Sequence, residues 1–220
     1  MYTGIVRGAF PVTFFNNKPG LLTYGVQLPP ELMDEISLGA SVNIDGVCQT
    51  VIKIENDALY FDASTETLRI TTLGDIKLGD NVHVERSAKL SDENGGHILS
   101  GHVDGKAKII KIAKSNFETI ITIEIPQPFR KYLFNKGFVA LHGCSLTICN
   151  YELNSGQFEI NLIPETIRLT QFGKKSAGDE INLEIDRQTQ VLVDTIERTL
   201  EQTLGNSLAR ILGKASNIKI

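Results

Sequence analysis

The sequence predicts an all-β protein made of two small closed barrels in series, followed by an amphipathic helix. An internal repeat and short alternating segments predict the barrels, and apolar residues at helical spacing predict the helix. Of the 220 residues, 41% are hydrophobic and 22% are charged, as in an ordinary globular protein. Extended disorder is therefore not expected.

The repeat appears as collinear matches between the two halves of the chain. Residues 3–8 match residues 100–105 at an offset of 97. After a two-residue insertion, residues 66–74 match residues 165–173 at an offset of 99. Because solenoid repeats run to about 20–50 residues, a unit this long is a domain of its own. The chain is thus a tandem duplication of one domain.

The duplication sets the expected domain boundaries. We expect one barrel over residues 1–97, a second over 98–186, and a C-terminal helix and tail over 187–220. The junction between the barrels, residues 87–97, is polar and contains glycine, as linkers commonly do.

Several short segments in each unit alternate with period two, the pattern of half-buried strands. Asp45-Gly46 lies between two such segments and predicts a tight hairpin. Five or six strands at this spacing are typical of a small closed barrel. Four further segments predict short helices or single helical turns, two of them started by proline: residues 29–36, 64–68, 128–133 and 164–167.

The C-terminal segment belongs to neither repeat and predicts a helix that begins after Asp186, a suitable N-cap. Gly205 is a candidate interruption. The apolar face of this helix either packs on the second barrel or associates with another subunit, and the sequence favours neither. Its apolar residues recur every three or four positions: Val193, Ile196, Leu200, Leu204 and Leu208.

Composition excludes several classes of function. The formal net charge of −4 argues against a nucleic-acid partner, which needs a basic surface. No apolar run is long enough to span a membrane, and the first residues do not form a secretory signal. Three cysteines and four histidines lack metal-ligand spacing. We therefore expect a reduced, cytoplasmic, metal-free protein.

Equivalent positions in the two repeats carry the residues best suited to chemistry. Residues 48–50 (Cys-Gln-Thr) correspond to residues 145–147 (Ser-Leu-Thr), and each set follows a glycine turn. Ile5 corresponds to His102, which shares a glycine-rich segment with His97. A lone cysteine such as Cys48 is far more commonly a small packing residue, and composition alone favours the two histidines as surface turn residues. A hydrolase, a transferase and a binding protein all remain open on these residues.

An ordered set of motifs over essentially the whole chain resembles the riboflavin synthases of the alpha-chain type, a family of lumazine-binding tandem barrels. Each motif is weak alone, whereas the set in this order and spacing is specific. The motifs are residues 3–6, 41–51 with Gly-x-Cys-x-Thr, 66–74, 95–102 with Gly-Gly-His, 136–138, 143–147 and 163–166.

The resemblance implies two six-stranded Greek-key barrels, a C-terminal helix and a cytoplasmic homotrimer. It implies dismutation of two molecules of 6,7-dimethyl-8-ribityllumazine into riboflavin and 5-amino-6-ribitylaminouracil, without a metal or other cofactor. The productive site would hold both molecules between the N-terminal barrel of one subunit and the C-terminal barrel of its neighbour. Association with lumazine synthase is a further implied partnership.

The resemblance also assigns residues. Cys48, His102 and Ser145 would be catalytic, as nucleophile or as acid and base. The other implied residues would contact ring edges and ribityl hydroxyls or close over the substrate. The substrate-binding set is Thr3, Gly4, Ile5, Val6, Ser41, Cys48, Gln49, Thr50, Asp62, Ala63, Ser64, Thr65, Glu66, Thr67, His97, Gly101, His102, Val103, Lys136, Ser145, Leu146, Thr147, Asn161, Leu162, Ile163, Pro164, Glu165, Thr166 and Asp186.

The chain departs from the family pattern at three positions, Tyr2, Gln49 and His142. His142 either alters proton chemistry near Ser145 or serves as a turn residue. The alternative to an enzyme is a non-catalytic lumazine- or flavin-binding protein on the same scaffold. The intact segment at residues 100–102 favours the enzyme.

Overall fold

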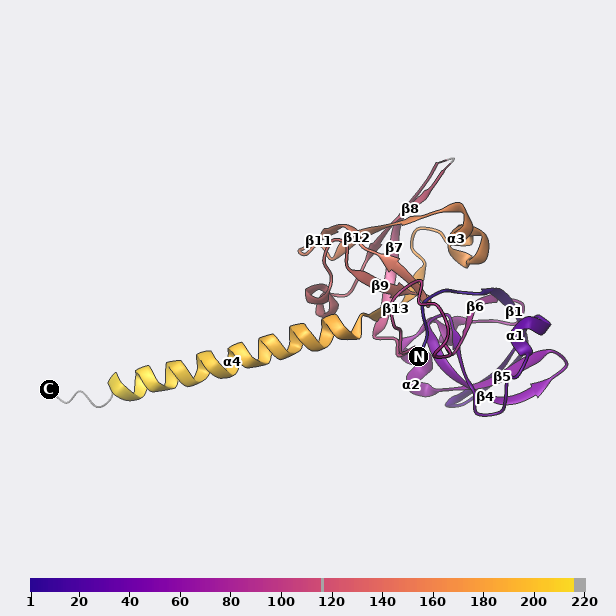
Figure 1. Ribbon diagram of the computed structural model, residues 1–220, viewed down its shortest axis with the longest axis horizontal. Helices are drawn as coiled ribbons and strands as arrows, with labels where there is room; N and C mark the ends of the chain where they lie inside the picture. The colour runs from indigo at the N-terminus through magenta and orange to yellow at the C-terminus, as the bar shows by residue number, and fades with distance from the viewer. Residues whose placement is uncertain (116, 216–220) are drawn as a thin grey trace. The chain divides into compact units, whose positions relative to one another are not determined.

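The computed structural model describes residues 1–115 and 117–215, with the side chains of the last helix described as far as residue 204. The chain divides into two compact units, one ending at Asp186 and one beginning at Arg187. The first unit contains both repeats and consists mainly of strands, and the second contains the helix (Figure 1). The predicted fold class is confirmed.

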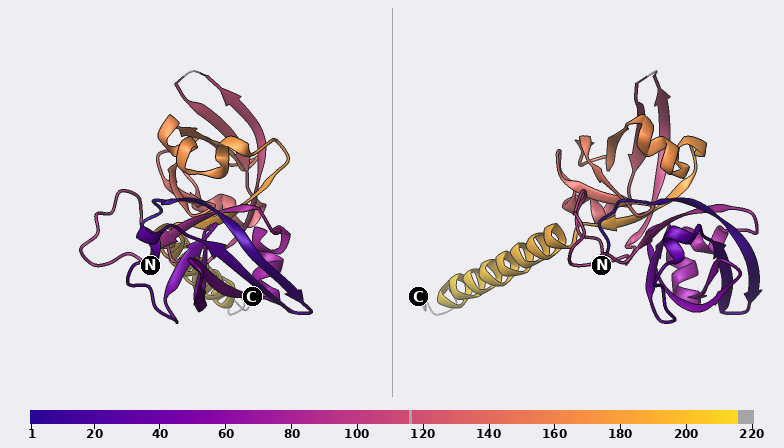
Figure 2. Two further views of the ribbon diagram at one scale, coloured as in Figure 1. Left: turned by 90° about the vertical axis from the view of Figure 1, so that its right-hand side faces the viewer. Right: turned by 45° about the vertical axis from the view of Figure 1, so that its right-hand side comes forward.

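The first repeat is a closed, six-stranded antiparallel barrel. The strand order β1-β2-β5-β4-β3-β6 is a Greek-key arrangement, and the barrel closes because β1 pairs with both β2 and β6. The right-hand view of Figure 2 shows this barrel as a ring. Its strands are β1 (Gly8–Lys18), β2 (Leu21–Gln27), β3 (Ser41–Ile44), β4 (Val47–Glu55), β5 (Ala58–Ser64) and β6 (Asn81–Arg86).

The Asp45-Gly46 turn joins β3 to β4, as predicted. Its φ angles of 49° and 90° are both left-handed, as a two-residue hairpin turn of this type requires. Alternation along β4 then turns Gln49 into the barrel, while Cys48 and Thr50 lie on its outer side. The outer side of β4 is therefore the side on which these two residues can meet a ligand.

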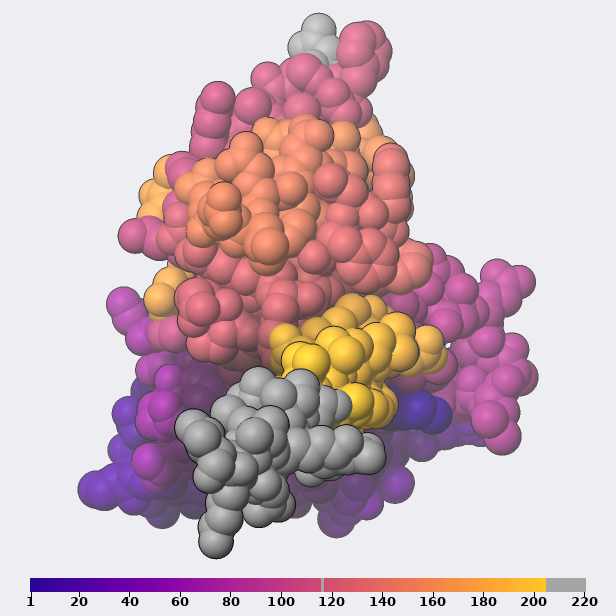
Figure 3. Space-filling view, turned by 90° about the vertical axis from the view of Figure 1, so that its left-hand side faces the viewer, coloured from indigo at the N-terminus to yellow at the C-terminus, as the bar shows by residue number. Residues whose placement is uncertain are grey.

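The second repeat is a nearly closed barrel with one difference from the first. Its order is β10-β9-β13-β7-β8-β12-β11, in which β10 and β11 together replace β4. The break falls at Ile148, beside Asn150 with its left-handed φ of 48°. Figure 3 shows the side chains of this repeat as one continuous body. Its strands are β7 (Gly105–Lys114), β8 (Thr119–Glu124), β9 (Phe138–Leu141), β10 (Cys144–Thr147), β11 (Cys149–Glu152), β12 (Gln157–Leu162) and β13 (Glu180–Ile185).

Short helices occur in all four segments where the sequence predicts them, and the one after residue 126 is a 3-10 helix. Ser64 caps α2, its hydroxyl accepting from the Thr67 N–H, while Pro164 begins α3 at the equivalent place. The short helices are α1 (Pro30–Met33), α2 (Thr65–Ile70), η1 (Thr72–Asp75), η2 (Gln127–Tyr132), α3 (Pro164–Leu169) and η3 (Gln171–Lys174).

The two repeats meet around a local two-fold relation. Tyr2 and Leu99, which are equivalent residues, exchange both backbone hydrogen bonds, at 2.9 and 3.0 Å. Gly46 and Gly143, also equivalent, face each other so closely that a Cβ on Gly46 would lie 2.8 Å from the Gly143 nitrogen. Glycine is therefore required at this contact.

A buried polar network crosses the interface between the two repeats through His83. Its Nδ1–H donates to the His142 carbonyl at 2.9 Å, and its Nε2 accepts from the Gln171 N–H at 2.6 Å. A backbone amide can only donate, so the imidazole is neutral with its proton on Nδ1. Burial lowers the pKa of His83 to about 4 and keeps this form at neutral pH.

Asn182, the equivalent of His83, makes the matching pair of bonds. Its Nδ2 donates to the Asp45 carbonyl and its Oδ1 accepts from the Thr72 N–H, both at 2.7 Å. His142 belongs to this network: it is buried, has a φ of 47°, and accepts from the Asn182 N–H at 3.3 Å. Of the two interpretations of His142, the structure therefore supports the turn residue.

The second unit is the helix α4 (Arg187–Ala215), which begins directly after Asp186. It runs through Gly205 without the candidate interruption. The Leu208 side chain lies outside the described residues. Four of its leucine and isoleucine side chains at four-residue spacing are exposed: Leu192, Ile196, Leu200 and Leu204. Among the described helices, none has the length and apolarity needed to cross a membrane.

Candidate functional site

Each repeat lends its N-terminal segment to the outer face of the other repeat. The Cys48 N–H donates to the Gly101 carbonyl at 2.8 Å, and the Ser145 N–H donates to the Gly4 carbonyl at 2.9 Å. Both glycines have positive φ, and a Cβ on either would lie 2.5–2.7 Å from the Cβ of its partner residue. The two segments are therefore exchanged, and only glycine permits the close contact.

The outer surface around Cys48 is called the N face. Thr50 pairs with Ser41 across β4 and β3, and Asp62 on β5 continues this row of polar side chains. The exchanged segment 101–103 borders the row through its contact with Cys48. The N face thus brings together predicted residues from three strands and from the other repeat.

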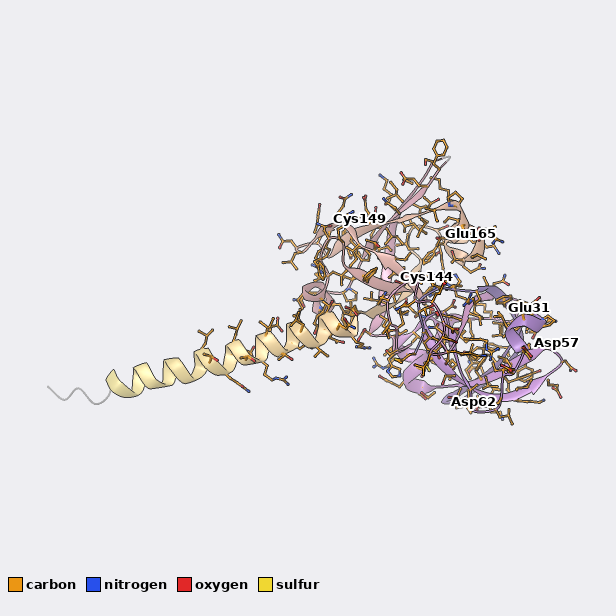
Figure 4. The ribbon with its side chains drawn as sticks, in the orientation of Figure 1. Glu31, Asp57, Asp62, Cys144, Cys149 and Glu165 are labelled. Atoms are coloured by element: carbon orange, nitrogen blue, oxygen red, sulfur yellow. The ribbon has the colours of Figure 1, made fainter. Side chains whose placement is uncertain are left out.

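The outer surface around Ser145 is called the C face. Thr147 follows on β10, Asn161 lies on β12 with its side chain exposed, and the exchanged segment 4–6 borders Ser145. In Figure 4, Asp62 of the N face lies well away from Glu165, which belongs to the helix after β12. The predicted residues therefore form two equivalent faces in one chain.

Ser145 and His97 form a hydrogen-bonded pair on the C face. The His97 Nδ1 lies 2.6 Å from the Ser145 Oγ, and the ring stacks on Phe138 at 5.2 Å with an interplanar angle of 18°. Burial lowers the pKa of His97, opposed by the charge of Asp186. A neutral His97 can accept the Ser145 proton, so the pair has the geometry of a general base.

Cys48 has a different partner on the N face. The Tyr2 hydroxyl donates to the Cys48 Sγ at 3.2 Å, and burial raises the pKa of Tyr2, which keeps its proton in place. Cys48 is half-buried, and His102 is exposed on the neighbouring exchanged segment. The two equivalent nucleophile positions therefore differ: a base accompanies Ser145, and a hydrogen-bond donor accompanies Cys48.

Lys136 adopts an unusual backbone conformation beside the C face. Its φ is 69°, in the left-handed region that disfavours residues with a Cβ, and its equivalent Gly39 has a φ of 82°. The side chain is exposed in the turn before β9. A lysine retained where glycine is better suited is an outlier of the kind that collects at functional sites.

Besides His97, which is buried as well, five of the predicted substrate-binding residues have side chains buried within the barrels or at the interface between them. They leave only main-chain groups for a ligand. Gln49 accepts from the Tyr24 hydroxyl at 3.2 Å, so its departure from the family pattern serves the barrel interior. The five buried residues are Val6, Gln49, Ala63, Val103 and Leu162.

The remaining predicted residues border the two faces on equivalent short helices. Glu66 pairs with Arg69 on α2, and Glu165 pairs with Arg168 on α3, both at 2.6 Å and both exposed. The same ion pair on both copies indicates a shared structural task, although exposed pairs stabilise little. The others in these segments are Ser64, Thr65, Thr67, Ile163, Pro164 and Thr166, with Thr3, Ile5 and Leu146 nearer the exchanged segments.

The sequence interpretation missed two buried carboxylates that hold the exchanged segments, Glu85 and Glu184. A signal was present, because both repeats place a glutamate at the same position of a strand, directly after a buried apolar residue (Val84 and Leu183). It also did not pair His97 with Ser145, since the two are far apart in the chain and meet only through the fold.

The polar side chains of Thr50 and Asp62 on the N face and of Thr147 and Asn161 on the C face are exposed. Three pockets of about 500–570 Å³ lie elsewhere, and none is lined by a residue of the predicted site. Among the described residues, no group of three or more acidic, histidine or cysteine side chains is close enough to hold a metal ion. All three cysteines are free thiols.

Comparison with known proteins decides the family. A model of the lumazine binding domain matches twice, at residues 3–87 and 100–186. The riboflavin synthase of Escherichia coli strain K12 is 45% identical over 201 residues, which cover 91% of this chain and 93% of that protein. This chain belongs to the riboflavin synthase family. Two lumazine-binding domains thus correspond to the two repeats.

Other riboflavin synthases give the same result. That of Chlamydia pneumoniae is 39% identical over 91% of this chain and 97% of its own length. That of Buchnera aphidicola from Schizaphis graminum is 40% identical over 93% of this chain and 98% of its own length. The chain therefore spans these relatives almost completely.

Among solved structures, LumP complexed with riboflavin is similar, with a TM-score of 0.79 and 22% sequence identity. The match covers 85% of this chain and 100% of LumP. LumP complexed with 6,7-dimethyl-8-(1'-D-ribityl) lumazine gives a TM-score of 0.77. At this identity the likeness shows a shared fold.

Proposed function

We propose that this protein is a riboflavin synthase. It transfers a four-carbon unit between two molecules of 6,7-dimethyl-8-ribityllumazine, giving riboflavin and 5-amino-6-ribitylaminouracil. The observation that carries the proposal is the pair of equivalent faces in a chain that is 45% identical to a riboflavin synthase over 91% of its length. Two similar faces suit a reaction whose two reactants are the same molecule.

The C face supplies the base. The 7-methyl group of the lumazine is acidic, and its deprotonation gives a carbanion that attacks the second molecule. His97 with Ser145 accepts this proton, because the imidazole is neutral at working pH and reaches the reacting group through the hydroxyl. Thr147 and Asn161 offer hydrogen bonds to ring edges and ribityl hydroxyls.

The N face prepares the acceptor molecule. Cys48 acts beside the ring either as a nucleophile or as a hydrogen-bonding group, with Tyr2 donating to its sulfur and His102 moving protons nearby. Thr50 and Asp62 hold the ribityl chain. Holding the two rings face to face supplies the proximity that a reaction without a cofactor needs.

The productive site forms between the N face of one subunit and the C face of another in a homotrimer. The exposed polar side chains of both faces support this arrangement, because an exposed face needs a cover to exclude water. The exposed apolar side chains of α4 support helix-to-helix association between subunits. The protein works in the cytoplasm, and lumazine synthase is its proposed partner.

The test is incubation of the purified protein with the dimethylribityllumazine alone, followed by the absorbance and fluorescence of riboflavin. We expect riboflavin to form and Ser145→Ala to slow it by about 10²-fold. Ser91→Ala, on an exposed turn, is the matched control and keeps the wild-type rate. Tight binding of lumazine without turnover would instead identify the alternative, a non-catalytic lumazine- or flavin-binding protein.

A further inference from the structure

Glu85, a buried residue of β6, binds the N-terminal segment of its own repeat. Its carboxylate accepts from the Thr3 N–H at 2.7 Å, the Thr3 hydroxyl at 2.7 Å and the Gly4 N–H at 3.1 Å. Successive N–H groups at a residue with positive φ form an anion-binding nest. Burial raises the pKa of Glu85, and these hydrogen bonds oppose the rise.

Glu184, on β13, repeats this arrangement in the second copy. It accepts from the Ser100 N–H at 2.7 Å, the Ser100 hydroxyl at 2.7 Å and the Gly101 N–H at 3.0 Å. Gly101 has a φ of 77°, as Gly4 has 75°. A chemically costly buried carboxylate is thus kept twice, each time with the same three donors.

The segment that each glutamate fixes serves the face of the other repeat. Gly4, fixed by Glu85, accepts from the Ser145 N–H, and Gly96 packs so tightly beside Thr3 that a Cβ there would lie 2.2 Å from the Thr3 carbonyl oxygen. Gly96 precedes His97, so the Glu85 nest sets the position of the base on the C face.

The Glu184 nest acts on the N face in the same way. Gly101, fixed by Glu184, accepts from the Cys48 N–H at 2.8 Å, and its missing Cβ would lie 2.7 Å from the Cys48 Cβ. The next residue is His102, whose N–H donates to the Ser100 hydroxyl at 3.2 Å. The Glu184 nest therefore fixes the positions of both the Cys48 thiol and the His102 imidazole on the N face.

We propose that Glu85 and Glu184 are positioning residues that act crosswise, Glu85 of the first repeat on the C face and Glu184 of the second repeat on the N face. Neither touches the reacting atoms. Each holds three donors whose segment forms the border of the opposite face. The proposal rests on the two faces being substrate-binding sites, as in the proposed function.

The experiment uses the full chain and the ring resonances of its four histidines in NMR spectra. His97 reports on the C face and His102 on the N face. We expect Glu85→Gln to shift His97 more than His102, and Glu184→Gln to shift His102 more than His97. The control Glu55→Gln removes an exposed ion pair with Lys53 and moves neither.

Turnover provides the second readout. Exchange of a carboxylate acceptor for an amide loses a charge-assisted hydrogen bond, so each variant lowers kcat by about tenfold or more and changes KM less. If a glutamine variant does not fold, Thr3→Val and Ser100→Ala each remove one donor. We then expect Thr3→Val to shift His97 more than His102 and Ser100→Ala to shift His102 more than His97, both by smaller amounts.

Equal shifts of both histidines in both variants, a reversed order, or no shift in either would overturn the crosswise assignment. A role in fold stability alone predicts the first of these results. The NMR comparison needs no turnover, so it remains decisive even if the wild-type protein forms no riboflavin. Failure of the wild-type protein to form riboflavin would refute the proposed function and leave the positioning role of the two glutamates intact.

Discussion

At the scale of single residues, the duplication places two different nucleophilic side chains, each with a different hydrogen-bond partner, at equivalent positions of the two repeats. Cys48 and Ser145 are equivalent, yet a tyrosine hydroxyl donates to the first and an imidazole bonds the second. The difference arises because Tyr2 and Leu99 are equivalent as well, so one repeat offers a phenol where the other offers a methyl group. In the proposed reaction, this difference would let a symmetric scaffold hold two identical substrates in different chemical roles.

The pH dependence of kcat tests His97 as the base. Burial lowers its pKa below the usual 6.5, so the neutral, proton-accepting form persists to lower pH than in a free imidazole. We expect the acidic limb of kcat to lie below pH 6.5 and to vanish in His97→Gln, with a loss of about 10²-fold. The measurement is kcat between pH 5 and 8. An unchanged limb in His97→Gln would remove the base from this account, and His102→Gln should retain the limb.

Lys136→Gly tests whether the strained lysine is kept for function. Glycine adopts a φ of 69° without steric cost, so we expect the free energy of unfolding to rise by about 0.5–1 kcal/mol while activity falls. Asn56→Gly, at an exposed turn with a φ of 50°, is the matched control and should gain stability with unchanged activity. Chemical denaturation and turnover provide the two values. Full activity in Lys136→Gly would show that the lysine has no functional role.

At the scale of elements, the strands and turns follow from the sequence, whereas the exchange of segments does not. The Asp45-Gly46 hairpin, the short helices and the closed barrel come from local signals that the structure keeps. The contact of Gly4 with Ser145 depends on how two barrels pack, and no periodicity encodes it. The strand break at Ile148 was not predicted either, because the equivalent stretch of β4 in the first repeat is continuous.

His83, at the interface between the repeats, leads to a prediction about how the free energy of unfolding depends on pH. Its pKa in the folded chain, about 4, lies below the value of 6.5 in the unfolded chain, so the unfolded chain binds the proton more readily. Stability is therefore lost as pH falls from 6.5 towards 4. His83→Asn restores the donor and acceptor that Asn182 already uses and removes this loss.

Urea unfolding between pH 4.5 and 7 measures the effect. We expect His83→Asn to lose less stability on acidification than the wild type, and His83→Ala to lose about 1–3 kcal/mol at neutral pH through unsatisfied partners. Asp45 acts in the opposite sense, because burial raises its pKa to about 7 and its contribution is lost as pH rises through that value. Equal acid sensitivity in the wild type and His83→Asn would exclude His83 as the cause.

At the scale of the whole molecule, two lumazine-binding domains cover residues 3–87 and 100–186, and a helix covers Arg187–Ala215. Each domain presents one face with exposed polar side chains, and the proposed reaction between two bound molecules places an N face opposite a C face. In the proposed trimer, association of subunits would provide this arrangement, and we propose that the C-terminal helix α4 serves that association.

Deletion of the residues after Asp194 tests the helix. Without most of the exposed stripe of α4, we expect monomers in sedimentation velocity, with lumazine still bound at the faces and turnover strongly reduced. The untruncated protein should sediment as a trimer. A truncated protein that remains trimeric would assign subunit association to the barrels instead.

The most direct test of the central claim is the stoichiometry of the reaction with dimethylribityllumazine as the sole reactant. Two equivalent faces that hold two copies of one substrate predict that two lumazine molecules disappear for each riboflavin and each 5-amino-6-ribitylaminouracil formed, with no other carbon donor. Quantitative chromatography of all three compounds gives the ratio. A ratio of one lumazine per riboflavin, or a requirement for an added carbon donor, would contradict the account.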